Sequence, residues 1–140
     1  MQLNSLKLIN FRNYEKLSLN FDKGINFIVG KDAKGKTNLV ESIYSLSLAK
    51  SFRTSNSNEL LMINKDFAEV KGIFINENYK KVIEIAFLKD GKKIKINNTL
   101  VKKTSELNNI VSALYFIPKD TNLLKDVPKN RRQFLNSNIS

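Results

Sequence analysis

Residues 30–37 of this 140-residue chain have the residue types and spacing of a phosphate-binding loop. They read Gly-Lys-Asp-Ala-Lys-Gly-Lys-Thr and fit the pattern G-x-x-x-x-G-K-[ST] at every fixed position. In such a loop backbone N–H groups surround phosphate oxygens, Lys36 would bind the β- and γ-phosphates, and the Thr37 hydroxyl would ligate Mg²⁺. The sequence therefore predicts a site for a nucleoside triphosphate such as ATP with Mg²⁺. Its predicted binding segment is Gly30, Lys31, Asp32, Ala33, Lys34, Gly35, Lys36, Thr37 and Asn38.

The segments that flank this loop have the composition that the motif requires. Residues 25–29 are apolar and either β-branched or aromatic apart from Asn26, which predicts a short buried strand before the loop. After the loop, Leu39, Ile43 and Leu46 follow helical spacing and predict a helix over about residues 36–48. Strand, glycine loop and helix in this order favour a phosphate site. The alternative is a plain strand-to-helix turn that happens to contain glycine.

The rest of the chain predicts mostly β-structure around the loop. The expected strands lie near residues 6–9, 17–21, 67–75, 80–88, 93–97 and 111–117. A short helix is expected near residues 104–109, and another begins after Pro128. We therefore expect a single α/β domain in which a P-loop core (residues 1–65 and 104–140) flanks a β-meander (residues 66–101).

The charge of the chain is strongly positive and unevenly distributed. The formal net charge is +11, from 24 basic and 13 acidic residues, and residues 71–103 alone hold nine lysines and three acidic residues. Such an excess indicates a polyanionic partner, nucleic acid before membrane. A general abundance of lysine in the sequence is the alternative explanation.

Two residue types that carry much protein chemistry are missing from the sequence. Without cysteine there is no disulfide framework and no thiol catalysis, and without histidine the commonest general base and metal ligand is absent. The N-terminus has no apolar signal core, and no apolar run approaches the length that spans a membrane. We therefore expect a cytoplasmic protein.

Four segments together resemble the RecF family, which is part of the SMC/Rad50-like branch of ABC-type ATPases. These segments are residues 8–14, residues 30–44, residues 50–54, and residues 116–120 followed by Pro128 and residues 131–135. Their order and spacing match the family from Met1 to the end of the chain. The resemblance implies an ABC-ATPase-type head lobe, in which an antiparallel β-subdomain packs beside a P-loop core.

The resemblance also implies partners and site residues. Family members dimerise on double-stranded DNA near gaps when they bind ATP, and they promote RecA loading together with RecR and RecO. By similarity, Arg12 and Asn13 would lie near the nucleotide, and Arg53 would lie near the DNA or nucleotide face. A solvated surface arginine is the alternative for Arg12 and Arg53. The candidate nucleic-acid contacts are Arg53, Lys92, Lys93, Lys95, Arg131 and Arg132.

The sequence departs from the family pattern at positions that bear on hydrolysis. Asp32 replaces the usual asparagine of the loop, and Lys119 stands where the family has the glutamate of Pro-Glu-Asp. The signature motif and the Walker B carboxylate, which belong to a second lobe in the family, are not found in the sequence. We therefore expect an N-terminal lobe, truncated relative to the family, that binds nucleotide without turnover.

Two other function classes remain open from the sequence. The first is a small P-loop NTPase or kinase that acts on a metabolite, which would need a second Mg²⁺ carboxylate and an acceptor pocket. The second is a basic nucleic-acid-binding β-module with a vestigial nucleotide loop, which the lysine-rich meander favours. Only RecF-like action predicts that ATP changes DNA affinity.

Overall fold

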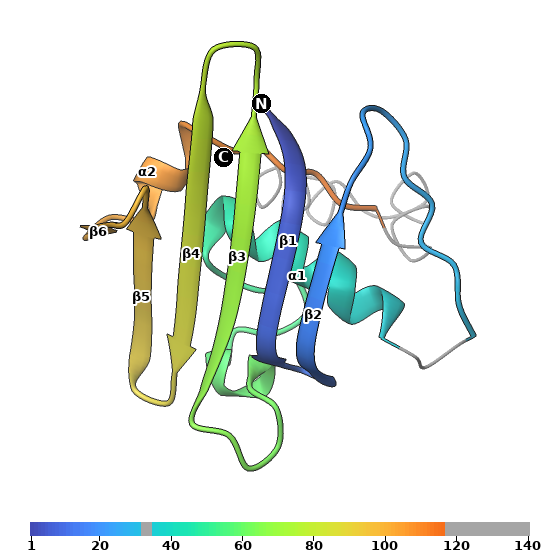
Figure 1. Cartoon of the computed structure of the whole chain (residues 1–140). Helices are drawn as coiled ribbons and strands as arrows, with labels where there is room; N and C mark the ends of the chain where they lie inside the picture. Colours follow the sequence, from blue (N-terminus) through green and yellow to red (C-terminus); the bar gives the residue numbers. More distant parts are fainter. Residues whose placement is uncertain (32–34, 117–140) are drawn as a thin grey trace, which may run out of the picture.

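One antiparallel sheet forms the framework of the protein. The computed structural model describes residues 1–31 and 35–116. Within them the six strands have the order β2-β1-β3-β4-β5-β6 (Figure 1). The strands are β1 (Gln2–Phe11), β2 (Tyr14–Asn20), β3 (Phe67–Ile75), β4 (Lys80–Leu88), β5 (Gly91–Ile96) and β6 (Thr99–Val101).

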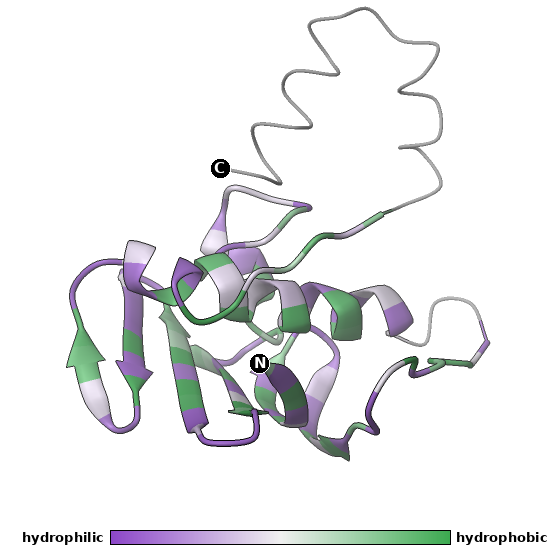
Figure 2. Ribbon diagram, turned by 90° about the horizontal axis from the view of Figure 1, so that it is seen from above, coloured by the Kyte–Doolittle hydropathy of each residue, from purple (hydrophilic) through white to green (hydrophobic). Residues whose placement is uncertain are grey.

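The helices cover one face of this sheet and leave the other face without a described helix. Helix α1 (Lys36–Leu48) runs across the strands, and the short helix α2 (Ser105–Asn108) lies on the same side (Figure 2). A 3₁₀ turn, η1 (Ser57–Leu60), follows α1 in the chain. None of the described helices is long and apolar enough to cross a membrane.

The core lies between α1 and the sheet. Alternate residues of the strands point toward the helix, as the period of two in a strand requires. The buried apolar side chains include Leu6 and Leu8 of β1, Ala68 and Val70 of β3, Ile83, Ile85 and Phe87 of β4, and Leu39 and Leu46 of α1. An ideal Cβ on Gly72 would lie 2.5 Å from Leu46 Cδ1, so glycine at this position lets α1 pack closely on β3.

Most elements expected from the sequence are present. The helix over residues 36–48 is confirmed, as are the three meander strands and the short helix near residue 105. The meander is continuous with the first hairpin, because β1 pairs along its length with β3, from Gln2↔Ile75 to Ile9↔Glu69. The division of the chain into a core and a meander stays a prediction. Strand β6 is not expected from the sequence, because it has only three residues.

The predictions of two strands are wrong within the described residues. Residues 25–29 form no strand, and Ile25, Phe27 and Val29 are 80%, 86% and 87% exposed. Residues 111–116 of the expected strand over 111–117 also have no strand structure, and Ile117 is outside the described residues. A strand needs a neighbour for its backbone hydrogen bonds, and neither segment pairs with a strand of the described sheet. The helix expected after Pro128 lies outside the described residues.

Candidate functional site

The end of the phosphate-loop motif is held by the first β-hairpin. Gly35 has a left-handed backbone with φ 95°, and α1 begins at the next residue. Tyr14 donates a hydrogen bond from its hydroxyl to the Gly35 carbonyl oxygen at 2.9 Å. Lys36 donates from Nζ to the Gly30 carbonyl oxygen, which joins the two ends of the loop. The first N–H groups of a helix have no partners within the helix, so this end of α1 can bind an anion.

The turn of the same hairpin, Arg12-Asn13, lies beside this helix end. Arg12 has φ 52°, an uncommon backbone conformation for a residue with a side chain. Its N–H donates to the Leu60 carbonyl oxygen at 2.8 Å, so the turn is also tied to η1. The Asn13 side-chain oxygen accepts a hydrogen bond from Asn38 Nδ2 at 2.8 Å. The hairpin, η1 and α1 therefore fix the position of this turn together.

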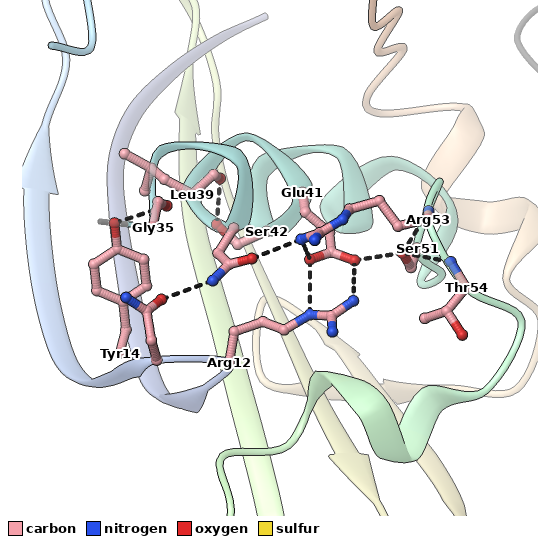
Figure 3. Close-up of polar contacts among 11 residues, drawn as sticks. Arg12, Tyr14, Gly35, Leu39, Glu41, Ser42, Ser51, Arg53 and Thr54 are labelled. Atoms are coloured by element: carbon pink, nitrogen blue, oxygen red, sulfur yellow. Dashed lines mark hydrogen bonds and ion pairs between the residues drawn. The ribbon is translucent and has the colours of Figure 1, made fainter. Parts of the chain in front are cut away.

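A fully buried carboxylate, Glu41 of α1, organises the polar side chains around the turn (Figure 3). Arg12 donates to it in bidentate fashion, from Nε to Oε2 at 2.9 Å and from Nη2 to Oε1 at 2.8 Å. Arg53 Nη1 donates to Oε2 at 3.3 Å, and the Ser51 hydroxyl donates to Oε1. A buried charge is tolerated only when it is paired and hydrogen-bonded, and these four donors meet that requirement.

The cluster of Arg12, Arg53 and Glu41 has a net positive charge of one. Two guanidinium groups share a single carboxylate, and Arg53 Nη1 also donates to Asn38 Oδ1 at 2.6 Å in the first turn of α1. The Arg53 side chain is 41% exposed, whereas that of Arg12 is 18% exposed. The extra positive charge adds to the positive end of the helix dipole, so this region favours an anionic ligand.

A surface hollow of about 600 Å³ opens next to the cluster. Its lining is Arg12, Asn13, Asn38, Arg53, Glu59, Leu61, Met62 and Ile63. Polar side chains from the hairpin turn and α1 form one part of the lining, and apolar side chains after η1 form another. This combination of a polar and an apolar wall is typical of small-molecule sites, and the lining includes one acidic side chain, Glu59 of η1.

The structure brings together several of the predicted site residues. Arg12, Asn13 and Asn38 line one hollow together with Arg53, a candidate nucleic-acid contact, and the Gly35 carbonyl oxygen accepts a hydrogen bond from Tyr14, the residue after the turn. Lys31 lies in the loop at the edge of the described residues. Residues 32–34, which include Asp32, Ala33 and Lys34, lie outside them, as do Lys119, Arg131 and Arg132.

The three meander lysines that the sequence groups together do not share one environment. Lys92 donates from Nζ to the carbonyl oxygen of Ala49, the C-cap of α1, at 2.7 Å. Partial burial lowers the pKa of Lys92, and the nearby positive charge of Lys50 lowers it further. Lys93 and Lys95 lie on the other face of β5, because successive side chains of a strand alternate.

We predict that Lys92 stabilises the fold by capping α1. Lys92→Gln should lower the free energy of unfolding by about 1 kcal/mol, because the helix loses a charge-assisted bond at its C-terminal end. Lys93→Gln removes the same charge from the opposite face and should change stability by less than about 0.5 kcal/mol. Urea unfolding of both variants measures the difference. Equal losses would contradict a capping role.

Glu41, Ser51 and Tyr14 are residues of this site that the sequence does not predict. Glu41 offers one signal, since it is the single acidic residue of a helix that packs on a core. Its partners Arg12 and Arg53 are 29 and 12 residues away in the chain, so no local pattern joins them.

The comparisons with known proteins all indicate the same family. The model of the RecF/RecN/SMC N-terminal domain matches residues 2–119. The DNA replication and repair protein RecF of Clostridioides difficile (strain 630) is 44% identical over 140 residues, which are 100% of this chain and 38% of that protein. RecF of Bacillus thuringiensis (strain Al Hakam) is 42% identical over 139 residues, 99% of this chain and 37% of that protein. The chain thus spans less than two fifths of the length of these curated relatives.

Solved structures agree with these matches. The recombination mediator protein RecF-ATPrS of the RecFOR pathway superposes with a TM-score of 0.86 at 36% identity, over 96% of this chain and 37% of that one. The RecF-ATP structure gives a TM-score of 0.85 at 36% identity, over 97% and 38%. An SMC ATPase structure shares the fold with a TM-score of 0.79 at 24% identity and full coverage of both chains. The expected ATPase-head fold and the resemblance to RecF, which rests on four segments, are both confirmed.

Proposed function

Because the chain belongs to the RecF/RecN/SMC N-terminal domain family, we propose that it is the ATP-binding lobe of a RecF-like DNA repair and recombination mediator. One observation supports this proposal above the others. The adjacent residues Arg12 and Asn13 meet Arg53, which is distant from them in the sequence, near the helix end that carries Gly35, Lys36 and Thr37. The similar RecF-ATP structure adds support for ATP as the nucleotide.

In the proposed complex each part of the site binds a different part of the nucleotide. Residues 30–37 and the N-terminus of α1 bind the phosphates, and the Lys36 ammonium lies beside the terminal ones. Arg12, Asn13 and Arg53 add donors and positive charge. The apolar wall of the hollow, which includes Leu61 and Met62, is suited to the flat face of a base.

For Mg²⁺ the chain offers one hydroxyl ligand, Thr37, in the first turn of α1. No group of three acidic residues that could hold a metal ion occurs in the described parts of the chain. Mg²⁺ commonly binds through few protein ligands, together with substrate phosphates and water, and a site of that kind fits these residues. When bound, the ion would neutralise phosphate charge.

We further propose that the partners are those of the RecF family. These are double-stranded DNA near gaps, RecR and RecO during RecA loading, and a second copy of the protein in the presence of ATP. The formal net charge of +11 supports a polyanionic partner. The chain by itself is proposed to bind nucleotide without turnover, because no apolar run ending in Asp-Glu occurs in its sequence.

The nucleotide site is tested by removing the lysine of the loop. Lys36→Ala should weaken Mg-ATP binding by about 2 kcal/mol, roughly thirtyfold, because the phosphates lose a charge-assisted hydrogen bond. Titration calorimetry on the whole chain measures the affinity, with Lys65→Ala, an exposed lysine outside the site, as the control. Equal affinities for the wild type and Lys36→Ala would overturn the assignment.

A further inference from the structure

The face of the sheet that points away from α1 carries two adjacent rows of side chains. The strand register places Lys16, Ile9, Glu69, Ala86 and Lys93 side by side across β2, β1, β3, β4 and β5. It places Ser18, Lys7, Lys71, Glu84 and Lys95 in the next row across the same strands. We call these ten residues the lysine face. Its strands lie in front of α1 in Figure 1, where no described helix covers them.

The charge of the lysine face is positive and mostly unneutralised. Five lysines stand against two glutamates, a formal net charge of +3. Lys71 is paired with Glu84 at 2.6 Å. The other four lysines, Lys7, Lys16, Lys93 and Lys95, are exposed, and none of them has an ion pair with a described residue. Such charges attract an anionic partner.

We propose that the lysine face binds the phosphate backbone of duplex DNA. The proposal rests on the proposed DNA-binding function and names the surface responsible for it. Lys16 and Lys93 are separated by four strand spacings, about 19 Å, and the two rows are about 7 Å apart. A surface this broad fits a partner with regularly repeated negative charge, and a duplex carries one charge per roughly 1.7 Å of its axis.

The other side chains of the lysine face favour DNA over an acidic protein. Ile9 and Ala86 between the lysines are only partly exposed, and no aromatic residue occurs in either row. Protein interfaces depend on several large apolar or aromatic anchors, whereas Ile9 is the single large apolar side chain of these two rows. Contacts limited to phosphates would also make binding indifferent to base sequence.

The experiment compares two variants that lose the same charge from different surfaces. The face variant combines Lys7→Gln, Lys16→Gln, Lys93→Gln and Lys95→Gln. The control variant combines Lys23→Gln, Lys65→Gln, Lys102→Gln and Lys103→Gln, all exposed positions outside the strands. Fluorescence anisotropy with a labelled 30-base-pair duplex gives affinity at several salt concentrations, and circular dichroism checks folding. A poly-glutamate of equal charge serves as competitor.

The expected result is a change in salt dependence that is specific to the lysine face. The slope of log affinity against log salt should become less steep by about 0.9 for each phosphate that no longer meets a lysine, up to about 3.6 in the face variant. The control variant should keep most of the wild-type slope. Poly-glutamate should compete much less well than unlabelled duplex.

Three outcomes would overturn the proposal, and they are distinguishable. If the wild type binds no duplex even at low salt, the proposed DNA-binding function fails as well. If the wild type binds but the face variant keeps its slope, DNA contacts another surface, such as the one near Arg53, and the function survives. If poly-glutamate competes as well as duplex, the face is suited to an acidic protein instead.

Discussion

Glu41→Ala is expected to lower the free energy of unfolding by about 3–5 kcal/mol. The Glu41 carboxylate is fully buried and accepts four hydrogen bonds, two of them from Arg12. Removing it leaves the Arg12 guanidinium, whose side chain is only 18% exposed, beside no compensating charge. It also leaves a hole where α1 meets the hairpin turn. Urea unfolding followed by circular dichroism measures the loss.

Two controls separate the ion pair from general damage to the helix. Ser51→Ala removes one neutral donor to the same carboxylate and the acceptor of the Arg53 and Thr54 N–H groups, so it should cost about 1–2 kcal/mol, still less than the loss of the carboxylate. Arg12→Ala combined with Glu41→Ala should cost clearly less than the sum of the two single changes, since the partners contact each other directly. Strict additivity would show that Arg12 and Glu41 do not stabilise each other.

Glu41 also connects the stability of the lobe to the candidate nucleotide site. The same carboxylate fixes Arg12 from the hairpin turn and Arg53 from the segment after α1. Both arginines line the hollow beside the phosphate loop. A nucleotide that draws Arg53 toward its phosphates would weaken one contact of Glu41 while leaving the bidentate pair intact.

Local patterns explain which parts of the fold the sequence predicts well. The helix over residues 36–48 follows from the spacing of Leu39, Ile43 and Leu46, and the meander follows from alternating residues and turn residues. These signals lie within one element or between adjacent ones. The loop motif is also a local signal, since all its fixed positions lie within eight residues.

The features that the sequence does not predict depend on contacts between distant segments. Arg12 and Glu41 are 29 residues apart, and only the packing of α1 against the first hairpin joins them. Position in the chain groups Lys92 with Lys93 and Lys95, but strand alternation turns its side chain toward the end of α1. The apolar character of residues 25–29 predicts burial, yet no described strand lies beside them.

Gly35→Ala is expected to lower the free energy of unfolding by about 3 kcal/mol. A side chain at φ 95° costs about 1–2 kcal/mol by itself, because a Cβ crowds the backbone in this conformation. The added Cβ would also lie 2.7 Å from Asn13 Nδ2 and 2.9 Å from the Tyr14 hydroxyl. Both side chains would have to move and would lose hydrogen bonds to Asn38 and to the Gly35 carbonyl, at about 1 kcal/mol each.

Gly24→Ala provides the matched control for this prediction. Gly24 has a similar backbone, φ 85°, but nothing lies within 4 Å of an added Cβ. This variant should therefore show only the backbone cost of about 1–2 kcal/mol. Asn13→Ala in the Gly35→Ala background should recover part of the loss, because it removes one of the two crowded side chains. Thermal and urea unfolding of the three variants measure these differences in stability. If Gly35→Ala and Gly24→Ala lose the same stability, the hairpin does not hold the end of the phosphate loop.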